Sequence, residues 1–183
     1  MKVSKVEYYY DQEFEKYLQA PGVSFSSLKN KTITETPAMA LGTSVHNYLL
    51  EPKKYNYENH EIVSSIAASI RKIIDPSLFE CEVSVTANFE HNGFVLPYKG
   101  RIDMLQSKRL VIDLKVLTGS LQNAIDFFKY DRQVSGYCYA TGIDKAVIIA
   151  YNKIARKVEL KSITPCAKFW EQVIIERGKL KHL

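Results

Sequence analysis

Cysteine is scarce in this sequence of 183 residues: there are three, Cys81, Cys138 and Cys166, far apart along the chain. Three distant cysteines form neither a disulfide framework nor a Cys-x-x-Cys metal site, and they suit a reducing compartment. The longest apolar run, residues 146–151, is much shorter than the ~20 residues that cross a bilayer. The N-terminus has no apolar signal segment. These absences predict a soluble, cytoplasmic protein with no membrane partner.

The composition is that of one compact domain with a mildly basic surface. Hydrophobic residues make up 46% of the chain, which at this length is enough to build a sizeable core. The formal net charge of +5 is compatible with a polyanionic partner such as DNA. We expect a single domain over residues 1–183, with N-terminal helices in residues 1–75 and a sheet with further helices in residues 76–183.

Helices are predicted from apolar periodicity and from their start and stop residues. The clearest one begins at Thr36-Pro37, where threonine can cap the helix and proline suits its first position, and it ends before Pro52. A polar linker, residues 30–35, precedes it. The predicted helices and helical turns are 7–19, 24–29, 36–51, 60–74, 120–128, 131–140 and 167–180.

Strands are indicated by strict alternation of apolar and polar side chains. Residues 80–90 alternate in this way, and soon after them comes Asn92-Gly93, the dipeptide that best fits a two-residue hairpin turn. We expect three strands between residues 79 and 116, and two more at 145–151 and 157–163. This order of elements predicts an α/β protein with a central mixed β-sheet flanked by helices.

Two short connections set the register of the three central strands. A loop at 107–109 places Asp103 opposite Asp113, and the Asn92-Gly93 turn places Glu82 opposite Asp103. Directly opposed side chains in antiparallel strands have Cβ atoms roughly 4.5–5.5 Å apart. Carboxylates this close repel one another unless a cation lies between them. The pattern therefore predicts a row of three carboxylates on one face of the sheet, around a divalent metal ion.

Lys115 lies two residues beyond Asp113, on the same predicted polar face, while Leu114 between them points into the core. Mg²⁺ prefers oxygen ligands, polarises a bound phosphate and lowers the pKa of bound water. A lysine beside it can deprotonate the attacking water or neutralise charge in the transition state. Two alternatives remain open. Glu80 shares a face with Glu82 and competes for its place, and Asp113 with Lys115 could be a solvated pair worth about 0–1 kcal/mol.

In these positions the chain resembles the PD-(D/E)XK nucleases, and within them the RecE and lambda-exonuclease (YqaJ-type) recombination exonucleases. Asp103, in Gly-Arg-Ile-Asp, matches the metal-binding aspartate of that superfamily, and residues 113–115 match its (D/E)-x-K motif. Residues 40–52 (ALGTSVHNYLLEP) and the Q-x-x-x-Y spacing of Gln133 and Tyr137 match the exonuclease branch.

The resemblance implies a restriction-endonuclease-like core and a Mg²⁺-dependent exonuclease, with Mn²⁺ as a substitute, that degrades double-stranded DNA from its ends, 5′→3′, in phage recombination. It also implies a bacterial or phage-infected cell, a ring-shaped homo-oligomer and a single-strand annealing protein as partner. No iron–sulfur cluster is expected, because the four cysteines that other branches use are missing. The implied metal ligands are Asp103, Asp113, Glu82, His46 and the backbone carbonyl of Leu114, and the other implied catalytic residues are Lys115, Gln133 and Tyr137.

Two further functions are compatible with the same motifs. One is an endonuclease or repair nuclease of the same fold, and the other is a DNA-binding module that has the fold without catalysis.

Overall fold

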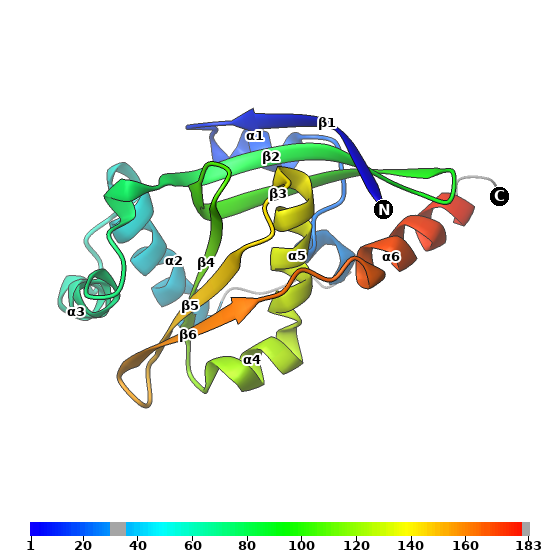
Figure 1. Ribbon diagram of the computed structural model, residues 1–183. Helices are drawn as coiled ribbons and strands as arrows, with labels where there is room; N and C mark the ends of the chain where they lie inside the picture. Colours follow the sequence, from blue (N-terminus) through cyan, green and yellow to red (C-terminus); the bar gives the residue numbers. More distant parts are fainter. Residues whose placement is uncertain (30–35, 181–183) are drawn as a thin grey trace.

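The computed structural model describes residues 1–29 and 36–180, which form a mixed β-sheet with helices on both faces (Figure 1). The sheet has six strands whose spatial order follows the sequence. Adjacent strands are antiparallel except β4 and β5, which are parallel and are joined by a crossover through α4 and α5. The strands are β1 (Lys2–Tyr9), β2 (Glu80–His91), β3 (Phe94–Gln106), β4 (Leu110–Leu117), β5 (Ala146–Asn152) and β6 (Lys157–Ile163).

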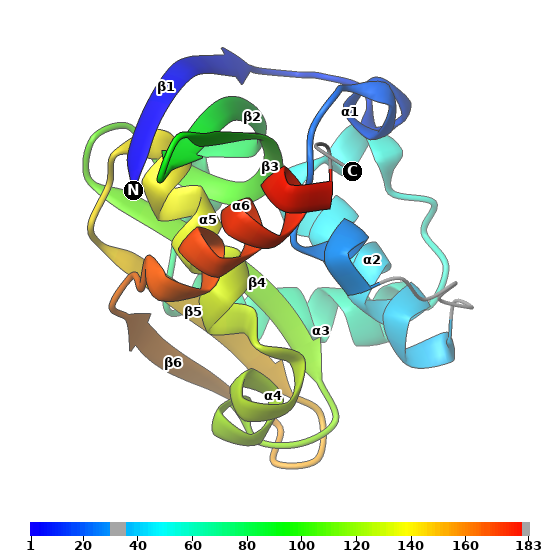
Figure 2. The same cartoon turned by 90° about the vertical axis from the view of Figure 1, so that its right-hand side faces the viewer.

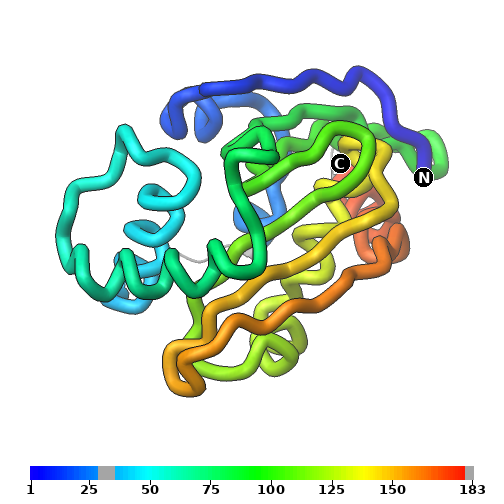
Figure 3. Tube along the Cα trace, turned by 60° about the vertical axis from the view of Figure 1, so that its left-hand side comes forward, coloured from blue at the N-terminus to red at the C-terminus, as the bar shows by residue number. Residues whose placement is uncertain are grey.

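The helices form two main groups, with α2 and α3 on one side of the sheet and α4, α5 and α6 on the other (Figures 1 and 2). Figure 3 shows the α2–α3 pair standing beside the sheet, apart from the second group. Among the described helices, none combines the length and apolar character needed to cross a membrane. The helices are α1 (Phe14–Gln19), α2 (Pro37–Leu50), α3 (His60–Arg71), α4 (Leu121–Phe128), α5 (Tyr130–Thr141) and α6 (Lys168–Leu180), with 3₁₀ turns at Ser26–Lys29, Pro52–Lys54 and Pro76–Leu78.

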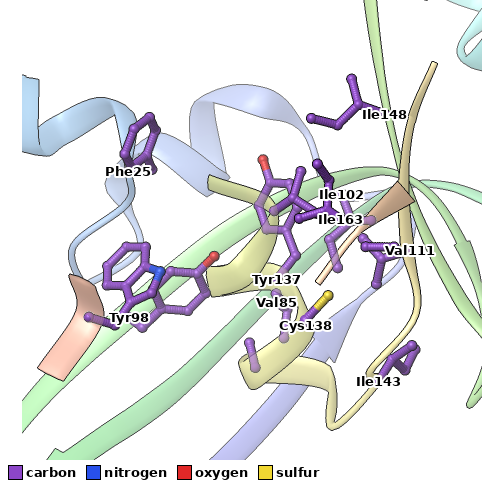
Figure 4. Packing of buried hydrophobic residues seen from close by; sticks show 14 of the residues in the cluster. Phe25, Val85, Tyr98, Ile102, Val111, Tyr137, Cys138, Ile143, Ile148 and Ile163 are labelled. Atoms are coloured by element: carbon purple, nitrogen blue, oxygen red, sulfur yellow. The ribbon is translucent and has the colours of Figure 1, made fainter. Parts of the chain in front are cut away.

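Two hydrophobic cores hold these layers together. The larger one joins the sheet to α4, α5 and α6 and contains Tyr98 of β3 and Tyr137 of α5 (Figure 4). The smaller one joins α2 and α3 to the opposite face through Met104, Ile112 and Leu114. Because β3 and β4 contribute to both cores, polar groups on these two strands are positioned by packing from both sides.

Local signals in the sequence account for several element boundaries. Thr36 accepts a hydrogen bond from the backbone N–H of Met39 at 3.3 Å, and Pro37 opens α2, so the predicted helix start is confirmed. Asn92 and Gly93 have φ values of 49° and 80°, as a two-residue hairpin turn requires, so the predicted turn is confirmed as well.

The N-terminal segment departs from the sequence-based prediction. Residues 7–19 are not one helix: β1 pairs with β2 through Val3–Phe89 and Tyr8–Val85, and α1 occupies only Phe14–Gln19. Tyrosine has a high strand propensity, and the edge of β2 offers unpaired backbone groups, so strand pairing outweighs the local helical pattern. The block of N-terminal helices expected in residues 1–75 therefore begins with a strand, while the predicted linker at 30–35 lies outside the described residues.

Candidate metal centre

The candidate site lies where the pairing of β3 with β4 ends. The backbone pairing stops at Met104 and Ile112. One step further along, Oδ2 of Asp103 accepts a hydrogen bond from the backbone N–H of Leu114 at 2.6 Å. A side-chain carboxylate thus takes the place of a backbone acceptor. The predicted register is confirmed, because Asp103 and Asp113 are the positions that follow the last backbone pair.

Glu82 lies in β2 at the position opposite Asp103, where the strand is irregular. The residues on either side of it pair with β3 in the predicted register. Glu82 itself has a φ of 53°, in the left-handed region, and its Oε1 lies 3.7 Å from Nδ1 of His46. Glu80 is exposed and accepts a hydrogen bond from Ser107. Of the two competing glutamates, Glu82 is therefore the one that the fold brings to the cluster.

His46 reaches this cluster from α2. Its Nε2 lies 2.9 Å from the carbonyl oxygen of Leu114, to which a protonated Nε2 donates a hydrogen bond. With Nε2 engaged in this way, Nδ1 faces the carboxylates, 3.9 Å from Oδ2 of Asp103. The ligand atoms of His46, Glu82 and Asp103 all lie within 4.8 Å of one another. Two carboxylates and one imidazole nitrogen therefore converge from a helix and two strands.

Asp113 and Lys115 form a separate ion pair next to this cluster. Lys115 Nζ lies 2.6 Å from Oδ2 of Asp113 and donates a hydrogen bond to the Leu114 carbonyl at 3.3 Å. The ammonium also lies 5.1 Å from the ring centroid of Tyr130 on α5. Asp113 is completely buried, because α5 packs over it, so the alternative of a solvated Asp113–Lys115 pair is wrong. Within the described part of the chain, Oδ1 of Asp113 has no hydrogen-bond partner.

The electrostatics of the site favour an added positive charge. Burial raises the pKa of Asp103 to about 7, against the attraction of His46 and with the help of Asp113. Burial lowers the pKa of His46, but Asp103 and Glu82 together outweigh it, so the net direction is upward. For Lys115, Asp113 and Asp103 likewise overcome the effect of burial and raise the pKa, so its ammonium stays charged. Burial, assisted by the neighbouring carboxylates, thus leaves the Asp103 carboxyl with a pKa near neutral pH.

Gln133 and Tyr137, both on α5, lie together as the sequence spacing predicted, and Nε2 of Gln133 donates a hydrogen bond to the Tyr137 hydroxyl at 2.7 Å. They line a cavity of about 530 Å³ that opens on the His46, Glu82 and Asp103 side chains. Close packing places Tyr137 here, since a Cβ on Gly100 would lie 2.9 Å from its ring. Other walls of the cavity include Phe14, Tyr17, Ser24, Ser27 and Lys99.

Two basic residues of β3 were not predicted to belong to the site. Arg101 is buried, and its Nε lies 2.6 Å from Oε2 of Glu82. Lys99 is also buried and donates hydrogen bonds from Nζ to carbonyl oxygens at the end of α1, at 2.7 Å from Leu18 and 2.8 Å from Ala20. The signal that could have identified them is a charged residue at alternate positions of a strand otherwise rich in buried residues.

The residues at this site fit a divalent metal ion. The cluster offers carboxylate oxygens, which are the ligands that Mg²⁺ and Mn²⁺ prefer, and beside them one imidazole nitrogen. The unpartnered Oδ1 of Asp113 is a further oxygen that a nearby cation would satisfy, because a buried carboxylate oxygen without a partner is destabilising. The backbone carbonyl of Leu114 already accepts hydrogen bonds from His46 and Lys115, so it faces the same space.

Comparisons with known proteins bear on the fold. The chain matches no protein-family model and no curated protein. It is similar to the structure of a candidate exonuclease from Eubacterium rectale, with 15% identity over 85% of this chain and 68% of that chain and a TM-score of 0.54. It is also similar to a phage-related exonuclease from Haemophilus somnus 129PT, with 16% identity over 90% of this chain and 93% of that chain and a TM-score of 0.44.

An alkaline exonuclease from Laribacter hongkongensis has 12% identity over 86% of this chain and 76% of that chain, with a TM-score of 0.44. We base the fold assignment on the Eubacterium rectale structure, whose TM-score of 0.54 is the highest of these three. The predicted fold class is confirmed: the chain has a mixed sheet flanked by helices and shares the fold of that exonuclease structure.

Proposed function

We propose that the protein is a divalent-metal-dependent nuclease that hydrolyses phosphodiester bonds at the ends of duplex DNA. The observation that carries this proposal is the convergence of His46, Glu82 and Asp103 within 4.8 Å beside the buried Asp113–Lys115 pair. The Eubacterium rectale structure, which has the same fold, is named as a candidate exonuclease, and this name supports the proposed nuclease function. The cavity next to the cluster gives a nucleotide access to it.

The proposed metal ligands are Asp103, Glu82, His46 and Asp113, with the carbonyl oxygen of Leu114 beside them. A bound Mg²⁺ polarises the scissile phosphate and lowers the pKa of water. The chain's own residues supply orientation and charge. The hydrogen bond from the Leu114 N–H fixes Asp103, and the hydrogen bond to the Leu114 carbonyl fixes the ring of His46.

In this mechanism Lys115 stabilises negative charge. Its pKa is raised by Asp113 and Asp103, so the ammonium is protonated at neutral pH and is suited to stabilise negative charge developing on the phosphate. Of the two roles predicted for this residue, the raised pKa favours stabilisation over proton abstraction. Gln133 and Tyr137 form a wall of the cavity beside the cluster, and in this proposal they orient the nucleotide.

The finer parts of the proposal rest on the sequence resemblance. They are Mg²⁺ as the physiological ion with Mn²⁺ as a substitute, 5′→3′ polarity, and a role in phage recombination. They also include a ring-shaped homo-oligomer, a single-strand annealing protein as partner, and the cytoplasm of a bacterial or phage-infected cell as the location. Light scattering coupled to size-exclusion chromatography tests the oligomer, since a monomer at micromolar concentration contradicts the ring.

A cleavage assay tests the main proposal. Linear duplex DNA labelled at either end is compared with covalently closed circles, each with Mg²⁺ and with EDTA. We expect Mg²⁺-dependent release of nucleotides from linear DNA only, beginning at the 5′ end. Nicking of closed circles would identify an endonuclease instead. Binding of DNA without metal-dependent cleavage would identify a non-catalytic module and contradict the proposal.

The matched variants are Asp103→Asn, which changes a proposed ligand, and Asp126→Asn, which changes an exposed aspartate on α4. Loss of cleavage in the first variant alone ties the activity to this site. Equal cleavage by both variants would contradict the assignment of the site.

A further inference from the structure

Glu82 adopts a backbone conformation that an ordinary strand residue avoids. Its φ of 53° lies in the left-handed region, inside a strand that is regular on both sides. For a residue with a Cβ this conformation costs free energy and persists only where surrounding contacts impose it. The contacts that hold Glu82 therefore affect the geometry of the proposed metal centre, to which this residue belongs.

Arg101 supplies the main contact, from the neighbouring strand β3. All three nitrogen atoms of its guanidinium are engaged by the protein: Nε lies 2.6 Å from Oε2 of Glu82, Nη2 lies 3.1 Å from Oε1 of Glu51, and Nη1 donates to the carbonyl of Gln12 at 2.9 Å. The Arg101 side chain is 8% exposed, so these partners compensate a buried charge. A rigid guanidinium fork fixes the relative positions of the groups that it joins.

The two carboxylate oxygens of Glu82 contact different partners. Oε2 is held by Arg101, while Oε1 faces His46 at 3.7 Å and belongs to the proposed ligand cluster. Arg101 therefore selects which oxygen of Glu82 is presented to the ion.

Glu51 extends this arrangement to the helix that carries His46. It is the residue that directly follows α2, and its backbone N–H bonds to the carbonyl of Asn47 in the last turn. The bridge Glu82–Arg101–Glu51 thus connects the irregular point of β2 to the end of α2. Both proposed ligands, His46 and Glu82, are consequently positioned relative to each other through one guanidinium group.

We propose that Arg101, held by Glu51, is a positioning residue that sets the geometry of the metal centre by fixing Glu82. The inference rests on the proposed function, because the ion is the one that function requires. It predicts that a change at Arg101 weakens the binding of the ion, while the chemistry at saturating metal is less affected. Positioning residues around metal ligands typically contribute about 10–100-fold in metal affinity or activity.

The test uses Arg101→Lys, which keeps the positive charge but lacks the planar guanidinium group. The control is Arg109→Lys, which makes the same change at an exposed position of the β3–β4 turn. Mn²⁺ affinity is measured by isothermal titration calorimetry without DNA, and cleavage is measured over a range of Mn²⁺ concentrations. We expect Arg101→Lys to weaken Mn²⁺ binding by about tenfold or more, with most of the turnover recovered at saturating Mn²⁺. We expect the control to bind like the wild type.

Glu51→Gln keeps the inference testable if Arg101→Lys does not fold, since it leaves the Arg101–Glu82 contact in place. We expect weaker Mn²⁺ binding in this variant too, by less than in Arg101→Lys, because the contact between Arg101 and Glu82 remains. If Arg101→Lys folds and its Mn²⁺ affinity is unchanged, the inference is overturned. If Arg101→Lys does not fold, unchanged Mn²⁺ affinity in Glu51→Gln overturns it instead. Either result leaves the proposed function intact. A wild-type protein that binds no Mn²⁺ and cleaves no DNA overturns both.

Discussion

The charge on Asp103 allows one prediction that can be worked through in numbers. Burial raises its pKa from 3.8 to about 7, so at pH 5 the folded protein holds a proton that the unfolded chain releases. The folded-state pKa lies about two units above pH 5, and each unit corresponds to about 1.4 kcal/mol, so the proton contributes about 2.7 kcal/mol at pH 5. This contribution is lost as the pH rises through 7, and it is close to zero at pH 8.

Asp103→Asn removes the titrating group and keeps a carbonyl oxygen that can accept the Leu114 N–H. We therefore expect the metal-free variant to gain stability relative to the wild type by about 2.7 kcal/mol between pH 5 and pH 8. Urea unfolding in EDTA measures the difference in the free energy of unfolding between the variant and the wild type, once at pH 5 and once at pH 8. At pH 8, Mg²⁺ should raise the unfolding midpoint of the wild type and leave that of the variant unchanged.

The control for this experiment is Asp126→Asn, at an exposed position of α4. Its stability should follow that of the wild type at both pH values. If the free energies of unfolding of Asp103→Asn and the wild type change in parallel from pH 5 to pH 8, the pKa of Asp103 is not raised, and the reasoning from its burial is refuted.

Three further changes have definite expected outcomes. Gly100→Ala places a Cβ 2.9 Å from the Tyr137 ring and should lower the free energy of unfolding by about 1–3 kcal/mol in a urea titration; unchanged stability would contradict the close packing. Lys99→Met removes the hydrogen bonds to the end of α1, so hydrogen exchange of the α1 amides should accelerate while that of β4 is unchanged. Lys115→Met leaves Asp113 buried without its partner and should destabilise the protein by about 3–5 kcal/mol. Adding Asp113→Asn should restore stability without restoring cleavage, and cleavage by either variant would contradict the proposed role of Lys115.

The register of the central strands could be predicted because short turns determine it. A two-residue turn at Asn92-Gly93 leaves no freedom in the pairing of its strands, and counting outward places Glu82 opposite Asp103. The approach of Gln133 to Tyr137 was equally predictable, since residues four apart lie on one face of a helix.

The rest of the site depends on contacts that the local sequence does not contain. The burial of Asp113 comes from the packing of α5 on β4, and no pattern in residues 110–117 distinguishes a buried carboxylate from a solvated one. Glu82, whose backbone lies in the left-handed region, is bound by Arg101, nineteen residues away in the chain. The strand β1 forms because the edge of β2 is available, which no window around residues 2–9 reveals.

The position of β3 and β4 between two separate cores has a consequence for how the proposed metal centre is assembled. His46 is carried by α2, which packs in the small core with α3. The helix that packs over Asp113 is α5, which belongs to the large core with α4 and α6. A chain with only one of these cores assembled lacks part of the proposed metal centre. The site is therefore complete only when both cores have formed, so the proposed activity would report on the folding of the whole domain.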